Sequence, residues 1–336
     1  MKKQEEAVSN KKEVELRSIN RSAVECYMNM KGRDRLLRHT LFSENGSCGN
    51  WTTTTGTPLI LQGHERLAKL GIWLEEYFPD WEWKNVRIFE TQFDDYFLVE
   101  SDGQGTIKKA GFKEIHCNIH YIHSFELNFG KIKSVREFMD VSQKMRSLGM
   151  KFPTINRTNV PVWENVPFET GGSRMNSVNT AKIPGDSEKI RELNRITVEK
   201  YMNTKGQDRL KRHELFVDDG CGGLWTTDTG LPIVIKGKDK LAEHAVWSLK
   251  CFPDWEWYNI KIFGTDDPNH FWVECDGHGK ILFPGYPEGY YENHFLHSFE
   301  LDNGKIVRNR EFMNVCQQLR ALGIPVPEVK REGIPT

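Results

Sequence analysis

The sequence repeats itself over most of its length. Shifting residues 13–150 by 174 positions places them on the second half of the 336-residue chain without an insertion or deletion. Phe78-Pro-Asp-Trp-Glu-Trp83 then falls on Phe252-Pro-Asp-Trp-Glu-Trp257, and His123-Ser-Phe-Glu-Leu127 falls on His297-Ser-Phe-Glu-Leu301. Solenoid repeats have periods of only ~20–50 residues. The long period therefore indicates a whole domain that has been duplicated and fused.

The repeat predicts four segments. Residues 1–12 are a polar, charged tail, residues 13–153 are the first domain, and residues 187–336 are the second. Residues 154–186, which are rich in proline, glycine and polar side chains, are expected to link them. Each domain is long enough to bury a core of its own.

Composition excludes several classes of partner. A net charge of −1 and a pI near 6.8 give no bulk attraction to nucleic acid or to an anionic membrane surface. No apolar stretch approaches the ~18 residues of a membrane span, and the first residues lack the apolar segment of a signal peptide. The seven cysteines include no Cys-x-x-Cys pair. They are expected to be reduced thiols in a cytoplasmic protein.

Within each domain a helical pattern comes first and a strand pattern follows. In the second copy, helices are expected over residues 187–201, 208–215 and 237–250, and a period of two begins at Trp255. Asp302-Asn303-Gly304 between two such runs predicts a β-hairpin. The glycine-rich residues 220–223 are expected to form a loop and a short strand. This layout is α+β, with helices on one face of a curved antiparallel sheet, and it predicts a cone with an interior pocket.

His244 and Ser248 stand four residues apart on one predicted helix, so they share a face. The first copy has Leu70 and Leu74 at these positions. The change from apolar to polar predicts a polar cavity in the second copy. A functional pair and a buried histidine with satisfied hydrogen bonds both remain open.

Glu311 and its counterpart Glu137 follow the predicted hairpin. Simple alternation from Ile306 places residues 307, 309 and 311 on one face of the strand. A carboxyl group facing a cavity would have a raised pKa, which suits a general acid at neutral pH. The alternative is an exposed glutamate paired with Arg310.

Three further features are candidates for ligand binding. Arg212 and its counterpart Arg38 are either clamps for a carboxylate or members of surface salt bridges. Tyr291 ends an aromatic segment, residues 283–291, that either lines a pocket or forms a surface turn; its counterpart is Cys117. His120/His123 and His294/His297 have metal-like spacing, but residues i and i+3 of a strand face opposite sides. Neither a metal nor a cofactor is expected.

Long runs of the second copy resemble the phenazine biosynthesis PhzA/PhzB family. They are Trp225-Thr-Thr-Asp-Thr-Gly230, residues 242–257, Phe283-Pro-Gly-Tyr-Pro-Glu-Gly-Tyr-Tyr-Glu-Asn-His-Phe-Leu-His297 and residues 322–336. The first copy resembles the PhzA-type companion but is more diverged. The resemblance implies tandem NTF2-like cone domains that pair as an intrachain pseudo-dimer and need no cofactor.

The resemblance also implies a reaction and its residues. Two molecules of an aminoketo-cyclohexene carboxylic acid condense head to tail by double imine formation. Glu311 and His244 are the implied catalytic residues, and Ser248, Arg212 and Tyr291 contact the substrate. Glu137 and Arg38 mark a weaker second site in the first copy.

Three other functions remain open. The chain is alternatively a binding module that holds phenazine precursors or products without converting them. The cone fold also supports isomerase-like proton transfer. The first copy, finally, could keep an activity of its own through Glu137. Further self-association of the chain is compatible with each of these functions.

Overall fold

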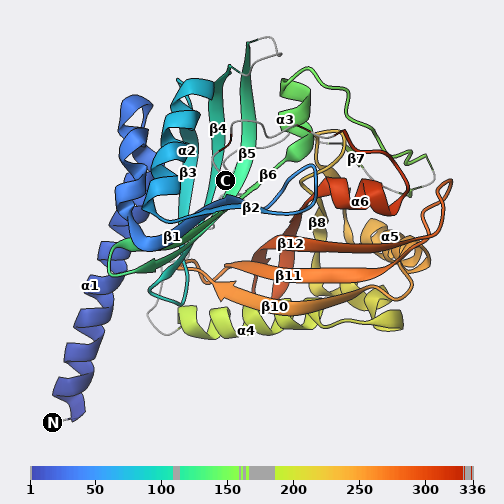
Figure 1. The fold of residues 1–336 in the computed structure, drawn as a ribbon. Coiled ribbons are helices and arrows are strands. Elements are labelled where there is room, and N and C mark those ends of the chain that lie inside the picture. Colours follow the sequence, from blue (N-terminus) through green and yellow to red (C-terminus); the bar gives the residue numbers. More distant parts are fainter. Residues whose placement is uncertain are drawn as a thin grey trace. The chain divides into compact units, whose positions relative to one another are not determined.

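The computed structural model in Figure 1 describes residues 2–108, 114–158, 160–161, 164–165, 186–327, 329 and 334. Most of the expected linker, residues 166–185, and part of the segment opposite residues 283–291 lie outside this range. The chain forms two compact units. The first contains residues 1–53, 57–150 and 328–336, and the second contains residues 54–56 and 151–327.

The first unit begins with helices and continues with a sheet. Its helical elements are α1 (Lys2–Asn29), the 3₁₀ helix η1 (Gly32–Leu41), α2 (His64–Tyr77) and α3 (Val141–Ser147). Its strands are β1 (Phe42–Asn50), β2 (Leu59–Gln62), β3 (Glu82–Glu90), β4 (Tyr96–Ile107), β5 (Ile115–Asn128) and β6 (Lys131–Met139). Figure 1 shows α1 and α2 beside this sheet.

The second unit repeats this order. Its helical elements are α4 (Asp186–Met202), η2 (Gly206–Leu215), α5 (Lys238–Cys251) and α6 (Val315–Ala321). Its strands are β7 (Glu164–Asn165), β8 (Phe216–Leu224), β9 (Ile233–Lys236), β10 (Glu256–Gly264), β11 (His270–Ile281), β12 (Gly289–Asp302) and β13 (Lys305–Met313). The expected helices and the expected hairpin are all present, and the α+β fold is confirmed. No helix in the described ranges has the length and apolarity to cross a membrane.

Each sheet is mixed rather than wholly antiparallel, which corrects the expected arrangement. The strand orders in the described residues are β2-β1-β6-β5-β4-β3 and β10-β11-β12-β13-β8-β9-β7. β1 pairs with β6, and β8 with β13, in parallel. The two parallel strands lie at opposite ends of the repeat in sequence, so no local sequence pattern predicts that they pair.

The glycine-rich segment of the second copy, expected to form a loop and a short strand, lies wholly within the nine-residue strand β8. A Cβ atom on Gly223 would lie 2.0 Å from the carbonyl oxygen of Ile233 on the neighbouring strand. Glycine is therefore required by close approach of the two backbones. The strand is held by its neighbours rather than by the β propensity of its own residues.

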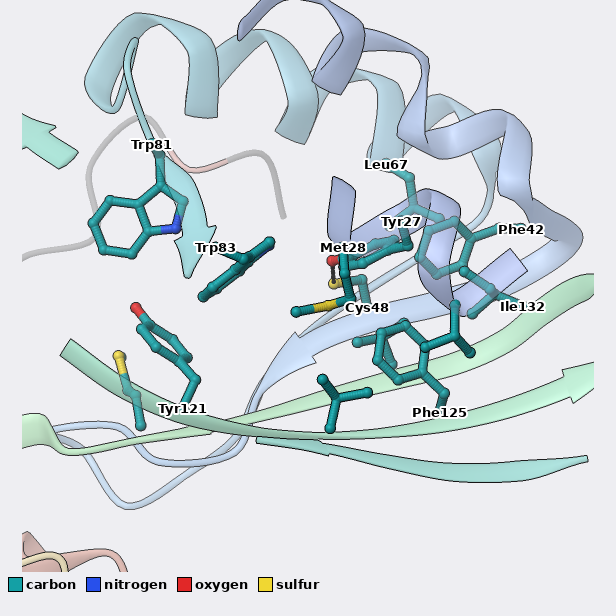
Figure 2. Packing of buried hydrophobic residues seen from close by; sticks show 14 of the residues in the cluster. Tyr27, Met28, Phe42, Cys48, Leu67, Trp81, Trp83, Tyr121, Phe125 and Ile132 are labelled. Carbon is teal, nitrogen blue, oxygen red and sulfur yellow. Dashed lines mark hydrogen bonds between the residues drawn. The ribbon is translucent and has the colours of Figure 1, made fainter. Parts of the chain in front are cut away.

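The core of the first unit lies between its helices and the concave face of the sheet. Figure 2 shows Trp81, Trp83 and Tyr121 gathered at one end of this layer. Tyr27 and Phe125 lie at the other end, with ring centroids 5.3 Å apart in an edge-on arrangement. The large aromatic rings leave a cavity between these two groups, described below.

The two hairpins have the same backbone but different residues at a strained position. Asn303 and Gly304 have φ angles of 46° and 78°, as a type I′ turn requires. In the first unit Phe129 has the same φ of 46°. Its side chain is 74% exposed, so packing does not compensate for the left-handed conformation.

We expect Phe129→Asn to stabilise the protein by about 1 kcal/mol, because asparagine tolerates positive φ and phenylalanine does not. The matched change, Asn303→Phe, should destabilise it by a similar amount. Urea denaturation of the full chain measures both. Equal midpoints for the wild type and the two variants would contradict this account of the turn.

Candidate functional site

The second unit encloses a cavity of about 220 Å³ between its helices and the concave face of its sheet. All five residues predicted for this site line it, namely Arg212, His244, Ser248, Tyr291 and Glu311. They come from η2, α5, β12 and β13. Six aromatic side chains form a large part of the remaining wall, namely Trp247, Phe252, Trp255, Trp257, Phe283 and Phe295.

Glu311 faces the cavity, as predicted, but the strand that carries it does not alternate evenly. The pairing of β12 with β13 passes from Leu301↔Ile306 to Glu300↔Arg308. Val307 is therefore an extra residue in a bulge. Ile306 is fully buried, and the equivalent Ile132 belongs to the hydrophobic core of the first unit. The expectation that Ile306 and Glu311 lie on opposite faces is thus wrong.

The carboxyl group of Glu311 is largely shielded from water, its side chain being 20% exposed. Burial raises its pKa to about 7, although the Arg212 charge and a hydrogen bond from Tyr201 act in the opposite direction. His297 Nδ1 is 3.9 Å from Glu311 Oε1. Arg310, which the sequence offered as an ion-pair partner of Glu311, instead bonds to Ser298 Oγ and lies over the ring of Trp272. A carboxyl group that is half protonated at neutral pH can both donate and accept a proton.

His244 is on the inward face of α5, together with Leu241 and Ala245. Its ring hydrogen-bonds to the backbone of Pro161, which must accept because proline has no N–H. Nδ1 is buried and has no partner among the described residues, so Nε2 carries the donated proton. Burial lowers the pKa of His244 to about 4. At neutral pH the ring is uncharged, and Nδ1 is its free acceptor atom.

Ser248 has a partner that the sequence did not single out. Arg209 Nη2 donates to Ser248 Oγ at 3.1 Å and its guanidinium also bonds to the carbonyl oxygen of Phe252. Arg209 is only 4% exposed and lines the cavity. Burial lowers its pKa to about 10. Position 249, where the first copy has Glu75, is leucine, so this buried cation is available to an anionic ligand.

Arg212 is held in place without a salt bridge to any described carboxylate. Its Nε donates to Thr204 Oγ1, its Nη2 donates to the Thr204 carbonyl oxygen at 3.2 Å, and its guanidinium lies 4.9 Å from the Tyr201 ring centroid. The surface salt bridge considered from sequence is therefore not its role. Arg209 and Arg212 together place two guanidinium groups in one wall, where they can bind a carboxylate.

Tyr291 lines the cavity with its ring, while its hydroxyl group is already occupied. Asn293 Nδ2 donates to Tyr291 Oη at 2.9 Å, and Tyr291 Oη lies 3.0 Å from Met313 Sδ. Its ring lies 5.1 Å from that of Trp255. The segment before it contributes Phe283 to the wall but leaves Tyr290 60% exposed. Residues 283–291 therefore line the cavity at some positions and face the surface at others.

Residues 155–158 and 160–161, which precede the second repeat, form part of the wall of this cavity; we call them the strap. Arg157 forms an ion pair with the fully buried Asp228, and the same carboxylate accepts from the Ile155 N–H at 2.7 Å. Val160 lines the cavity. The strap ends at Pro161, the partner of His244. The sequence contained no signal for it, because a backbone carbonyl has no residue signature.

The first unit has a matching cavity of about 170 Å³ with a different lining. Leu70 and Leu74 occupy the positions of His244 and Ser248, while Arg38 and Glu137 are retained. Burial raises the pKa of Glu137, and the charges of Arg38 and Lys144 oppose this. Ile334, the counterpart of Val160, lines this cavity.

The paired histidines with metal-like spacing are separated by the strand. His294 Nδ1 bonds to Asp276 Oδ1 at 2.7 Å, whereas the His297 ring packs edge-on against Trp257 in the cavity wall. In the part of the chain that the structure describes, no three His, Cys, Asp or Glu side chains are arranged to hold a metal. All seven cysteines are free thiols.

The fold and the cavities define two NTF2-like cone domains, each with an interior pocket of a size suited to a small molecule. The chain belongs to the phenazine biosynthesis protein A/B family, whose sequence profile matches residues 1–162 and again residues 175–336. The resemblance seen in the sequence is thereby confirmed.

Individual relatives match about half of the chain each. Phenazine biosynthesis protein PhzB1 of Pseudomonas aeruginosa is 88% identical over 151 residues, which are 45% of this chain and 93% of that protein. PhzA1 of the same organism is 62% identical over 162 residues, 48% of this chain and 100% of that protein. A crystal structure of the phenazine biosynthesis-related protein phzb2 from P. aeruginosa, 87% identical, matches with a TM-score of 0.45 and covers 45% of this chain and 98% of that one.

We expect the raised pKa of Glu311 to make stability depend on pH. Proton binding is tighter in the folded state, so the folded protein loses stability as pH rises from the ordinary glutamate range through about 7. Glu311→Gln should remove this loss, which is worth ~2–3 kcal/mol. Thermal unfolding at pH 5 and pH 8 measures it.

An exposed glutamate on the same helix as His244 supplies the control for that measurement. Glu243→Gln removes a charge from the surface of α5. The variant should follow the wild type at both pH values. If Glu311→Gln also follows the wild type, the carboxyl group is not desolvated as described.

Proposed function

We propose that the second unit catalyses formation of the phenazine ring system without a cofactor. Its substrate would be two molecules of a 6-amino-5-oxocyclohex-2-ene-1-carboxylate type compound, and its product the tricyclic phenazine-dicarboxylate precursor. Membership of the family supports the pathway. The observation that carries the chemistry is the desolvated carboxyl group of Glu311 in a cavity that also contains His244 and two arginines.

Imine formation requires protons to move in both directions. The amine nitrogen of one molecule attacks the ketone carbon of the other, and a C–N bond forms as the carbonyl π bond breaks. The resulting carbinolamine loses its hydroxyl group as water only after that oxygen receives a proton. Two such steps release two water molecules. Protonated Glu311 supplies the proton, and its carboxylate recovers one from the nitrogen.

His244 has a narrower role than a proton shuttle. With a pKa lowered to about 4 it is uncharged at neutral pH, and its bare Nδ1 accepts a hydrogen bond from the attacking amine. Arg209 and Arg212 bind the substrate carboxylate, and Ser248 orients Arg209. Tyr291 contributes its ring to the wall.

Orientation should supply much of the rate enhancement. Aminoketones condense unaided, and fixing two reactants in position is worth effective molarities of ~10⁵ M or more. The aromatic walls suit flat six-membered rings. Because the reaction needs little chemical catalysis, a site built from one acid, one acceptor and two guanidinium groups is sufficient for it.

The first unit would support this activity rather than duplicate it. It keeps Glu137 and Arg38 but lacks the histidine and the serine. We infer that the two units pair within the chain, as the repeated halves suggest, and that the free thiols reflect a cytoplasmic location. Further self-association of the chain remains compatible with this arrangement.

The second candidate is a binding module that holds phenazine precursors or products without converting them. The enclosed aromatic cavity favours binding of flat molecules in either case. The two functions differ in what Glu311 does, because a binding module needs no proton donor of matched pKa.

The two candidates are separated by assaying product formation from freshly generated aminoketone acid. We expect Glu311→Gln to fall to the uncatalysed rate, since general acid catalysis contributes ~10² or more. His244→Leu, the residue of the first copy, should be reduced less. Glu137→Gln is the matched control and should retain the wild-type rate. If all four proteins match a sample without protein, the chain is a binding module.

The pH dependence tests the acid directly. The protonated fraction of a carboxyl group with a pKa of about 7 falls tenfold per pH unit above that value. We expect the ratio of catalysed to uncatalysed rate to fall in the same way as pH rises. Taking the ratio cancels protonation of the free substrate amine. A ratio that stays constant from pH 6 to 9 would exclude Glu311 as the acid, whereas His244 predicts no change in that range.

A further inference from the structure

A buried asparagine lies beside Glu311 on the same strand. Asn309 comes two residues before Glu311 on β13 and after the bulge at Val307, so the two side chains share a face of the strand. The residue is only 1% exposed, and its Nδ2 donates to Glu311 Oε1 at 3.5 Å. The protein therefore contacts the carboxyl group through a neutral amide as well as through the groups that line the cavity.

The two oxygens of the Glu311 carboxyl group have different surroundings. Oε1 lies 3.5 Å from Asn309 Nδ2 and 3.9 Å from His297 Nδ1. The same side chain also lines the cavity. A carboxyl group that is held by the protein at one oxygen can present the other oxygen to a ligand.

The two copies differ at this asparagine in a compensated way. The first copy has Val135 in place of Asn309. Asn309 is paired with Gly222 on the parallel neighbouring strand, whereas Val135 is paired with Cys48. A polar side chain on the last strand and a glycine opposite it in the second unit thus correspond to an apolar side chain and a cysteine in the first.

The cysteine of the first unit does not replace the asparagine in its contact with the glutamate. Figure 2 shows Cys48 next to Tyr27, with 3.7 Å between Sγ and the tyrosine Oη. The tyrosine hydroxyl group in turn donates to Glu137 Oε1 at 3.5 Å. Val135 has no side-chain donor. The glutamate of the first unit therefore has a tyrosine beside it but no amide.

Other groups around Glu311 can change their protonation state, and Asn309 cannot. These titratable groups are Tyr201 of α4, Arg209 and Arg212 of η2, His244 of α5, Cys275 of β11, and Tyr291 and His297 of β12. Burial raises the pKa of the tyrosines and the thiol and lowers that of the histidines. Only the arginines among them are therefore charged at neutral pH.

An amide N–H group can only donate, so Asn309 bonds to Oε1 only while that oxygen carries no proton. We propose that Asn309 is a positioning residue for Glu311, which keeps the proton off Oε1 and so assigns proton exchange with the ligand to Oε2. The same bond stabilises the carboxylate after the proton has left. This role rests on the proposed function of Glu311 as the acid. Val135 cannot act on Glu137 in this way.

The test is a carboxyl titration of the full chain without substrate, so its result does not depend on catalysis. In protein labelled with ¹³C-glutamate, the Glu311 carboxyl signal is the one absent from Glu311→Gln. Asn309→Val should raise the titration midpoint of this signal by roughly half a pH unit or more, because the carboxylate loses a donor. At acidic pH the infrared C=O band of the protonated group should move to higher wavenumber, because Oε1 is no longer a hydrogen-bond acceptor.

The control is a second buried asparagine of the same sheet. Asn293 donates to Tyr291 Oη, and the first copy has Ile119 at its position. Asn293→Ile therefore removes a buried amide that does not contact Glu311. The variant should keep the wild-type titration midpoint and infrared band of that residue.

A double variant covers the case in which Asn309→Val does not fold. Gly222→Cys combined with Asn309→Val reproduces the pair that the first unit already accommodates, and a Cβ atom on Gly222 would lie 3.6 Å from its nearest neighbour, an ordinary contact. We expect the same upward shift. The inference is overturned if Glu311 titrates as in the wild type in either variant, or if Asn293→Ile shifts it equally. Such a result leaves the proposed reaction itself untouched.

Discussion

The parallel pairing of the last strand with the first strand of each unit is the constraint on which both cavities depend. In the second unit the Trp225 N–H donates to the Glu311 carbonyl oxygen at 2.8 Å, and Thr226 Oγ1 bonds to both backbone groups of Met313. The first unit repeats these bonds with Trp51, Thr52 and Met139. The glutamate on this strand is therefore positioned by backbone geometry before any ligand binds.

This constraint explains why the two copies share the segments that hold their strands and differ in residues that line their cavities. The Trp-Thr-Thr segment and the Phe-Pro-Asp-Trp-Glu-Trp segment hold strands in place, and they are identical in both copies. Gly103 and Gly277 allow the indole rings of these segments to lie against the sheet, because a Cβ atom there would approach them within 2.3 and 2.4 Å. At a position that differs, His244 contacts the backbone of the strap instead, through Pro161. Residues at such positions can change the lining of a cavity without changing the cone.

The parts of the structure that the sequence predicted correctly are those with a local pattern. Helical periodicity identified α4 and α5, and Asn303-Gly304 identified the hairpin. Comparison of the two copies correctly predicted that His244 and Ser248 line a cavity. The length of strand β8 was underestimated because its glycines have no side chains to form a period. The predicted facing of Ile306 relative to Glu311 was wrong because it assumed regular alternation, and the bulge at Val307 breaks that alternation. Arg209 and Pro161 were missed because their roles arise from contacts across more than 30 residues, as with Arg209 and Ser248.

The strap belongs to the second structural unit although it precedes the second sequence repeat. The repeat that a sequence comparison delineates begins near residue 187, yet the wall of the second cavity includes Arg157 and Val160, and His244 depends on Pro161. A gene fragment cut at the repeat boundary would encode an intact cone with an incomplete pocket. Duplication created two copies of a fold, but the stretch of chain that lines the second cavity starts about thirty residues before the second repeat.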